Sequence, residues 1–314
     1  MTKSFSHKQP YPLGAHTEGG GVRFSFVSKA ESCGILLYDR HTGSLLEKIP
    51  FVGEDRIGNV YCRAVENIDT KACAYLFYEG ERLIPDERGR AFPKRIPYGK
   101  ARTAADMKAG FLTDEFDWEG DCFPRIPYRR VIGYCLHVRG FTKHTSSNVE
   151  HRGTFAGIKE KIPYLKEIGI TTLELQPAYE FAEIPLKGET AGNLPHVMDA
   201  AVAGRPAGKE LNYWGYKKGY YYAPKAAYAA SCDPAVEFKE LVRALHGSGM
   251  ELVMQFYFPK EVKRREILEI LCFWVLEYHV DGFRLLGDNL PMDMLARDDV
   301  LADTKLRHYG YDTD

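Results

Sequence analysis

The sequence lacks several patterns that mark large classes of protein. No run approaches the roughly 18 consecutive apolar residues that a membrane-spanning helix needs, and the amino-terminal MTKSFSHKQPYPLG has no apolar core of a secretory signal. Excess charge of one sign is also missing, because 42 lysines and arginines balance 43 acidic residues. We therefore expect a cytoplasmic protein that binds neither nucleic acid nor membranes.

Patterns for metals and nucleotides are absent as well. The seven cysteines form no CxxC pair and are odd in number, which fits neither a zinc site nor a disulfide framework. We expect most of them to be small buried apolar groups. No GxGxxG or GxxxxGK[ST] follows a predicted strand, which argues against a nucleotide site. Nothing in the sequence requires a metal or an organic cofactor.

The first third of the 314-residue chain has a pattern of short strands. Between Val22 and about Pro85, turn residues separate the segments VRFSFVSK, CGILLYDR, SLLEKIPF, VYCRAVEN and AYLFYEGERLI. Short strands at regular intervals without a helix predict a small antiparallel β-sandwich. Residues 86 to 130, rich in Pro, Gly, Arg and Asp, predict an irregular connector.

After Arg130 predicted strands and helices alternate. The expected strands are VIGYCLHV, TTLELQ, MELVMQFYF, VDGFRLL and ADTKLRHY. One helix is expected to run from a Thr154 cap through Ile168, a second to follow Asp233 and Pro234, and a third to span residues 260 to 278. This alternation predicts parallel βα units. On pattern alone, a doubly wound sheet and a (β/α) barrel both remain open.

Longer segments resemble a known family. YCLHVRGFTKHTSSNVEHRGTFAGIKEKIPYLKEIGITTLELQPAYEF closely resembles the first two βα units of the α-amylase superfamily, nearest to the glycogen-debranching and type I pullulanase-like enzymes. NYWGYKKGYYYAPKAAYA, DPAVEFKELVRALHGSGMELVM, WVLEYHVDGFR and VLADTKL are similar to later family segments in the same order. YPLGAHTEGGGVRFSFVSKA resembles the family's amino-terminal sandwich, of the carbohydrate-binding-module type.

The resemblance implies an immunoglobulin-like β-sandwich followed by a (β/α)8 barrel of the TIM type. We expect the sandwich in residues 1–110, a linker in 111–130 and the amino-terminal part of the barrel in 131–314. That last segment is shorter than the about 250 residues of a complete barrel, and it has only four to five predicted strands. Either the natural chain continues beyond Asp314 and supplies the missing carboxyl-terminal half of the barrel, which we favour, or a partner protein closes the sheet.

The catalytic positions depart from the family pattern. Retaining hydrolysis of α-linked glucose needs a nucleophile and an acid/base about 5 Å apart, and a barrel presents them at the carboxyl ends of its strands. The family's fourth-strand motif DGFRFD ends in the nucleophile, and alignment on DGFR puts Leu286 at that position. The fifth-strand segment resembles LADTKLIAEPWD, and alignment puts Tyr309 at its general-acid glutamate.

The third strand is altered in the same way. Where the family has DVVYNH, this chain has QFYFPK, so Gln255, Pro259 and Lys260 replace the Asp, Asn and His. We therefore expect no catalytic residue in this chain, and we expect Lys260 to be a solvated charge before a helix. Displaced acids could replace the missing carboxylates only from Asp288, or from Asp312 and Asp314.

Some residues suited to sugar binding remain. Arg284 aligns with the family's strand-four arginine, Tyr216 in NYWGY aligns with the aromatic that stacks on a glucose ring, and Trp214 lies beside it. The alternative is that Arg284 is a satisfied buried cation and that Trp214 and Tyr216 only pack a loop. For His137 and His279 we expect core or helix-surface roles.

Three functional hypotheses follow. The first is a debranching-type protein that has lost hydrolysis and at most binds an α-glucan such as glycogen, pullulan or a maltooligosaccharide. The second is a structural or interaction protein with a vestigial cleft, and burial of both Trp214 and Tyr216 would favour it. The third is an active glycoside hydrolase that uses displaced carboxylates.

Overall fold

The computed structural model describes residues 9–94, 96–112, 116–184 and 211–308. These residues form two compact units. One comprises the described residues up to 94 together with 102–112, and the other comprises 96–101 and the described residues from 116 onward.

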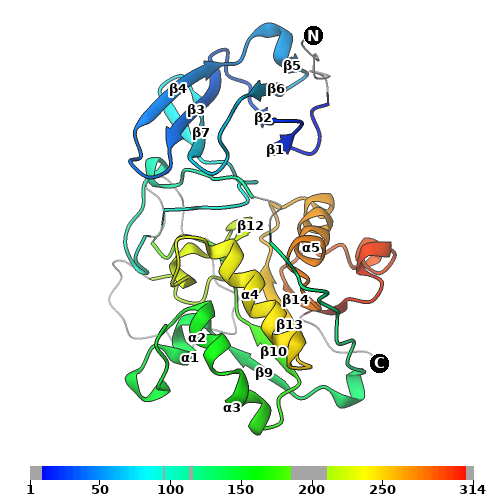
Figure 1. Cartoon of the computed structure of the whole chain (residues 1–314). Helices are drawn as coiled ribbons and strands as arrows, with labels where there is room; N and C mark the ends of the chain where they lie inside the picture. The colour runs from blue at the N-terminus through cyan, green and yellow to red at the C-terminus, as the bar shows by residue number, and fades with distance from the viewer. Residues whose placement is uncertain (1–8, 95, 113–115, 185–210, 309–314) are drawn as a thin grey trace. The chain divides into compact units, whose positions relative to one another are not determined.

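The first unit contains two four-stranded antiparallel sheets. Their strand orders are β1-β2-β6-β5 and β4-β3-β7-β8 (Figure 1). The strands are β1 Gly14–Glu18, β2 Gly21–Val27, β3 Cys33–Asp39, β4 Leu45–Pro50, β5 Arg56–Ile57, β6 Val60–Glu66, β7 Cys73–Glu79 and β8 Arg82–Ile84. Phe24 of β2 meets Tyr75 and Phe77 of β7, with ring centroids 5.2 and 6.3 Å apart, so the two sheets share one aromatic core. The predicted sandwich is confirmed.

One predicted strand of this unit is a hairpin. The segment AYLFYEGERLI contains β7 and β8, which pair antiparallel across Gly80. Gly80 has φ +57°, a conformation that most L-residues avoid, so the chain reverses there instead of continuing as one strand.

The second unit contains a five-stranded parallel sheet with the strand order β15-β14-β13-β10-β9. Figure 1 shows α4 beside this sheet, and α4 contacts β13. The order follows the chain and the strands pair in parallel, as expected for the first part of an α/β barrel. The elements of the unit are β9 Gly133–Leu136, α1 Val138–Thr142, α2 Phe155–Glu160, α3 Ile162–Glu167, β10 Thr172–Leu175, β11 Tyr179–Glu180, β12 Tyr220–Pro224, α4 Pro234–Gly247, β13 Glu251–Tyr257, α5 Arg264–Tyr278, β14 Gly282–Leu286, α6 Met292–Leu295 and β15 Lys305–His308.

The helix starts follow local chemistry. The Asp233 side chain accepts a hydrogen bond from the Val236 N–H at 3.2 Å, and Pro234 occupies the first turn of α4, so the predicted capped start is confirmed. The predicted continuous helix from Thr154 to Ile168 is wrong. Two helices, α2 and α3, meet at Lys161, because Pro163 has no N–H and its ring clashes with the preceding turn.

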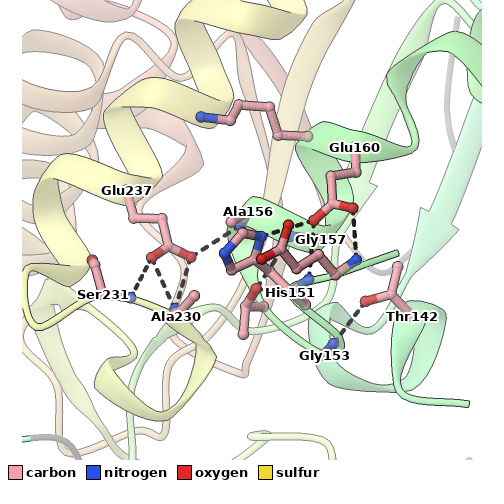
Figure 2. A network of polar contacts seen from close by, with 12 residues as sticks. Thr142, His151, Gly153, Ala156, Gly157, Glu160, Ala230, Ser231 and Glu237 are labelled. Carbon is pink, nitrogen blue, oxygen red and sulfur yellow. Dashed lines mark hydrogen bonds and ion pairs between the residues drawn. The ribbon is translucent and has the colours of Figure 1, made fainter. Parts of the chain in front are cut away.

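The buried carboxylate of Glu237 connects α4 to two neighbouring segments. Glu237 accepts hydrogen bonds from the backbone N–H groups of Ala156, Ala230 and Ser231 (Figure 2). It thereby satisfies an unpaired donor at the start of α2 and holds the loop that precedes α4. Glu237 therefore links the loop after β12 to the start of α2.

The prediction that most of the seven cysteines are buried is wrong for four of them. Cys33, Cys62 and Cys73 are buried, Cys272 is half-buried, and the remaining three are exposed: Cys122, Cys135 and Cys232. Strand β9, which carries Cys135, pairs on only one side in the described sheet, and three of its four residues remain exposed. Within the described ranges, no helix combines the length and apolar character needed to cross a bilayer.

A histidine between two carboxylates secures the amino-terminal ends of the strands. His246 of α4 places Nδ1 2.9 Å from an Asp121 oxygen and Nε2 2.9 Å from Oδ2 of Asp281, and all three side chains are almost fully buried. Burial alone lowers the pKa of His246, but hydrogen bonds and charges from Asp281 and Asp121 outweigh it, and the pKa rises above 6.5. Folding therefore favours protonation of the His246 ring.

The raised pKa of His246 predicts that the stability of the fold depends on pH. A folded-state pKa that is raised stabilises the protein fully below the unfolded pKa of about 6.5, and the stabilisation is lost as pH rises through the folded pKa. We expect the free energy of unfolding in urea to fall as the pH rises above about 6.5. This fall should be absent in His246→Gln and retained in His41→Gln, whose histidine lies in an exposed turn. Equal slopes in the wild type and His246→Gln would contradict the assignment.

Candidate functional site

The candidate site lies on one face of the five-stranded sheet, toward the carboxyl ends of its strands. We call this the polar face and define it by the side chains of Cys135, Glu174, Gln255, Arg284 and Arg307. Gln255 and Arg284 are in register on β13 and β14, and Arg284 and Arg307 are in register on β14 and β15. The opposite face carries fully buried apolar side chains: Leu173, Leu175, Met254, Phe256, Phe283 and Leu285.

The predicted catalytic positions lie where barrel chemistry would occur, but they carry other groups. Leu286 is the last residue of β14 and pairs in register with Tyr257 of β13. Lys260 is exposed in the turn before α5, as expected for a solvated charge. Tyr309, Asp312 and Asp314 lie outside the described residues.

Asp288 follows a sharp turn after β14 and is exposed. Gly287 in this turn has φ +141°, and a Cβ there would lie 2.1 Å from the Phe258 carbonyl oxygen. Only glycine fits this turn, so the chain leaves the strand end before Asp288.

Gln255 is at the centre of a hydrogen-bond network on the polar face. Its Oε1 accepts a hydrogen bond from the Tyr216 hydroxyl, and its Nε2 donates to Oε1 of Glu174 and lies 3.3 Å from the Cys135 sulfur. Arg284 Nη1 lies 3.4 Å from the same Glu174 oxygen. The amide of β13 thus connects β9 and β10 with the loop that carries Tyr216, and Arg284 of β14 joins the network through Glu174.

The environment of this network keeps its weak acids protonated. Burial first, and then the charge of Glu174, raise the pKa of the Cys135 thiol to about 11, although the residue as a whole is exposed. Burial, aided by Cys135 and Glu174, also raises the pKa of the Tyr216 hydroxyl. Near neutral pH the thiol is therefore a poor nucleophile and the phenol acts as a hydrogen-bond donor.

Trp214 is exposed but rigidly supported. Its ring meets that of Tyr213 edge-on at 5.0 Å and that of His137 at 5.7 Å, and 40% of the residue is accessible to solvent. His137 stacks on Tyr213 at 4.4 Å and places Nε2 2.9 Å from the Tyr213 carbonyl oxygen. Tyr98 donates to the same carbonyl at 2.6 Å. An exposed indole with fixed neighbours is a ready surface for stacking a flat apolar ligand face.

The histidine in this support is neutral, with Nδ1 accepting a hydrogen bond and Nε2 donating one to the Tyr213 carbonyl oxygen. Burial, with smaller contributions from Lys225 and Arg139, lowers the pKa of His137 to about 4. Nδ1 of His137 accepts the N–H of Gly140 at 2.9 Å and so caps α1, which agrees with the structural role expected for this residue. His279 also has a structural role, since it ends α5 and stacks on Trp118.

A fully buried ion cluster lies among the same loops. Nζ of Lys225 lies 2.5 Å from Glu183, 3.4 Å from Glu180 and 2.7 Å from the Phe181 carbonyl oxygen. It also lies 3.8 Å from the centroid of the Phe181 ring. The cluster joins the segment after β10 to the segment after β12, so the loops that carry Trp214 and Tyr216 have a rigid base.

The structure separates two residues that the sequence analysis grouped. Trp214 faces solvent, whereas Tyr216 is 5% exposed and turns toward Gln255. Arg284 is not a buried cation, because 41% of its side chain is accessible. Glu174, Gln176 and Cys135 were not predicted as site residues, although an acid and an amide at alternate positions of the apolar strand TTLELQ are a signal, since buried polar groups need partners.

Other parts of the second unit are weaker candidates for a functional site. Among the described residues no group of three or more His, Cys, Asp or Glu side chains is arranged to hold a metal ion. A cavity of about 250 Å³ lies at the amino-terminal ends of β13 to β15, where Glu251, Asp281 and Thr304 line it. Barrel enzymes use the other end of their strands, so the polar face remains the candidate.

The curated proteins that this chain resembles in sequence include isoamylases and glycogen debranching enzymes. No family model matches the chain. Isoamylase 1, chloroplastic, of Oryza sativa subsp. japonica is 28% identical over 348 residues, covering 88% of this chain and 41% of that protein. The glycogen debranching enzyme of Erwinia tasmaniensis is 26% identical over 348 residues, covering 88% of this chain and 50% of the enzyme.

A solved structure supports the fold. The pullulanase SAP of Group B Streptococcus, crystallised with maltotetraose, matches 96% of this chain and 46% of its own with a TM-score of 0.70 and 19% identity. The chain therefore spans half or less of the length of these relatives.

Proposed function

Because the chain is homologous to isoamylases, glycogen debranching enzymes and pullulanases, we propose that it binds α-glucan at the carboxyl ends of its barrel strands without hydrolysing it. The observation that carries this proposal is the rigidly supported and exposed Trp214 beside the polar face. Stacking of a sugar ring on this indole, with hydrogen bonds from Arg284 and the Gln255 network, would orient a glucan chain. The maltotetraose complex of the homologous pullulanase SAP supports a linear maltooligosaccharide as the ligand class.

The proposed loss of hydrolysis rests on the strand ends. Leu286 ends β14 without a carboxylate, and Asp288 lies beyond a turn that only glycine fits. Glu174 is a carboxylate on the polar face, but its Oε1 already contacts Gln255 and Arg284. Because misplacement of a reacting group by about 1 Å can cost a hundredfold in rate, displaced acids do not replace an aligned pair.

Affinity electrophoresis in gels with and without glycogen or pullulan tests the proposal. We expect the polysaccharide to retard the wild-type chain. Trp214→Ala should weaken this binding by about tenfold or more, because loss of a central aromatic contact costs about 1.4 kcal/mol or more. Tyr164→Ala, which removes an exposed aromatic of α3, is the matched control and should bind normally. The same preparation should release no reducing ends above a heat-killed control.

The buried Tyr216 supports a second candidate, an interaction protein with a vestigial cleft. Unchanged mobility in both polysaccharide gels would favour that candidate. Release of reducing ends that is lost in Asp288→Asn would instead favour a hydrolase with a displaced carboxylate.

A further inference from the structure

The peptide unit that ends at Trp214 is held by two donors from distant parts of the sequence. Its carbonyl oxygen, that of Tyr213, accepts the Tyr98 hydroxyl at 2.6 Å. The same oxygen lies 2.9 Å from Nε2 of His137. Because a peptide unit is planar, holding its oxygen also orients the N–Cα bond of the next residue. The two donors therefore help to set the direction in which the Trp214 side chain leaves the loop.

The residue after Trp214 is held as firmly. The Gly215 N–H donates to Oδ1 of Asn212 at 3.1 Å. Gly215 has φ +80°, and a Cβ there would lie 2.5 Å from a carbon of the Phe181 ring, so only glycine fits. Trp214 thus lies between two fixed peptide units, and contacts of its backbone contribute to the orientation of its indole.

Tyr98 lies in a tight turn. The Lys100 N–H donates to the Pro97 carbonyl oxygen at 3.1 Å, and Gly99 has φ +80°. A type II turn favours glycine at its third position, and the sequence Pro-Tyr-Gly-Lys supplies it there. Tyr98 takes the second position, where its side chain projects from a turn of defined shape.

The Tyr98 ring has contacts that do not depend on its hydroxyl. It stacks on Tyr228 with the centroids 5.9 Å and the planes 16° apart, and the Arg139 guanidinium lies 4.9 Å from its centroid. Burial first, and then the charge of Glu183, raise the pKa of Tyr98, so the phenol stays protonated and can donate near neutral pH. Removal of the hydroxyl alone should leave the ring in its place.

The segment that carries Tyr98 is also distinctive in its connections. Residues 96–101 belong to the second unit, whereas the chain on both sides of them belongs to the first. Within the first unit, the Gly110 N–H donates to the Ala91 carbonyl oxygen at 2.8 Å, and Nζ of Lys94 lies 2.6 Å from Oδ1 of Asp106. The support of Trp214 thus includes a donor from a segment whose two ends are joined within the first unit.

We propose that Tyr98 is a positioning residue of the glucan site, which fixes the indole of Trp214 for stacking on a sugar ring by holding the Tyr213 carbonyl group. This inference rests on the proposed glucan binding at Trp214. Tyr98 acts through Tyr213 and needs no contact with the sugar. Without the Tyr98 hydroxyl the carbonyl group keeps only the His137 donor, and ordering the indole on binding then costs more free energy.

Isothermal titration calorimetry with maltotetraose tests this role. Tyr98→Phe removes the hydroxyl and keeps the ring, and we expect it to weaken the affinity about fivefold, the effect of one hydrogen bond. Tyr61→Phe is the matched control, because the Tyr61 hydroxyl of the first unit also donates to a backbone carbonyl, that of Ala30, at 3.2 Å. It should bind maltotetraose as the wild type does.

A spectroscopic readout separates positioning from general stability. The chain has three tryptophans, Trp118, Trp214 and Trp274, so labelling with 5-fluorotryptophan should give three ¹⁹F resonances, and Trp214→Phe identifies the one from Trp214. In ligand-free Tyr98→Phe the Trp214 resonance should shift or broaden, while the other two stay in place. Tyr61→Phe should leave all three unchanged. Urea denaturation shows whether each variant is folded.

The outcomes distinguish this inference from the proposed function. Wild-type affinity for maltotetraose in Tyr98→Phe would overturn the positioning role and leave glucan binding intact. Weaker binding with an unchanged Trp214 resonance, or an equal loss of affinity in Tyr61→Phe, would overturn it as well. No binding of maltotetraose by the wild-type chain would overturn the proposed function and, with it, the role of Tyr98.

Discussion

Replacement of Lys225 by methionine is expected to lower the free energy of unfolding by about 3–5 kcal/mol. The lysine lies fully buried between Glu180 and Glu183, whose side chains are also fully buried. Methionine keeps the volume of the side chain but leaves two carboxylates without their cation in a medium that solvates charge poorly. Urea denaturation followed by far-ultraviolet circular dichroism measures the change.

Lys260→Met is the matched control for this change. Lys260 lies exposed in the turn before α5, so the same substitution there should change the free energy of unfolding by less than about 0.5 kcal/mol. If Lys225→Met lowered the free energy of unfolding by less than about 1 kcal/mol, other groups would have to compensate the two carboxylates. The ion cluster would then not be the base of the Trp214 loop.

The second large effect is expected at the amino-terminal end of β14. Asp281→Ala removes the carboxylate that accepts the Leu252 N–H at 2.7 Å and contacts Nε2 of His246 at 2.9 Å. A buried imidazolium then keeps only Asp121, and a backbone donor of β13 loses its partner. We expect a loss of about 3–5 kcal/mol in the free energy of unfolding, measured by urea denaturation at pH 6.5.

Asp288→Ala provides the comparison, since Asp288 is an exposed acid at the other end of the same strand. It should change stability by less than about 0.5 kcal/mol. A small effect for Asp281→Ala as well would mean that His246 is held by Asp121 alone. The pair of variants separates the two ends of β14: Asp281 maintains the barrel, whereas the carboxyl end carries the candidate site.

The contacts of the DGFR motif divide it by role. Asp281, the first residue of the motif, contacts His246 of α4 and the backbone of β13. Arg284, its last residue, lies on the polar face, 3.4 Å from Glu174 and in register with Arg307. A chain can therefore keep the motif for its fold while the residue at the strand end, here Leu286, changes.

Much of the fold could be predicted from the sequence, because its signals are local. The Asp233-Pro234 start of α4 depends on a cap within three residues, and the five parallel strands follow from apolar runs that alternate with helical spacing. The expected catalytic departures also depend on short aligned motifs, as at Leu286. Two predictions were wrong because proline and glycine interrupt regular elements. Pro163 divides one predicted helix into two, and Gly80 turns one predicted strand into a hairpin.

The composition of the candidate site was decided only by the tertiary structure. Trp214 and Tyr216 are two residues apart in a loop, where no period tells which side chain faces solvent, and the contact of Tyr216 with Gln255 turned it inward. Glu174 meets Arg284 across 110 positions of sequence, and Arg284 lies beside Arg307 only because of the register between β14 and β15. Local propensity sets which elements form, but strand register and packing decide which distant side chains share a face.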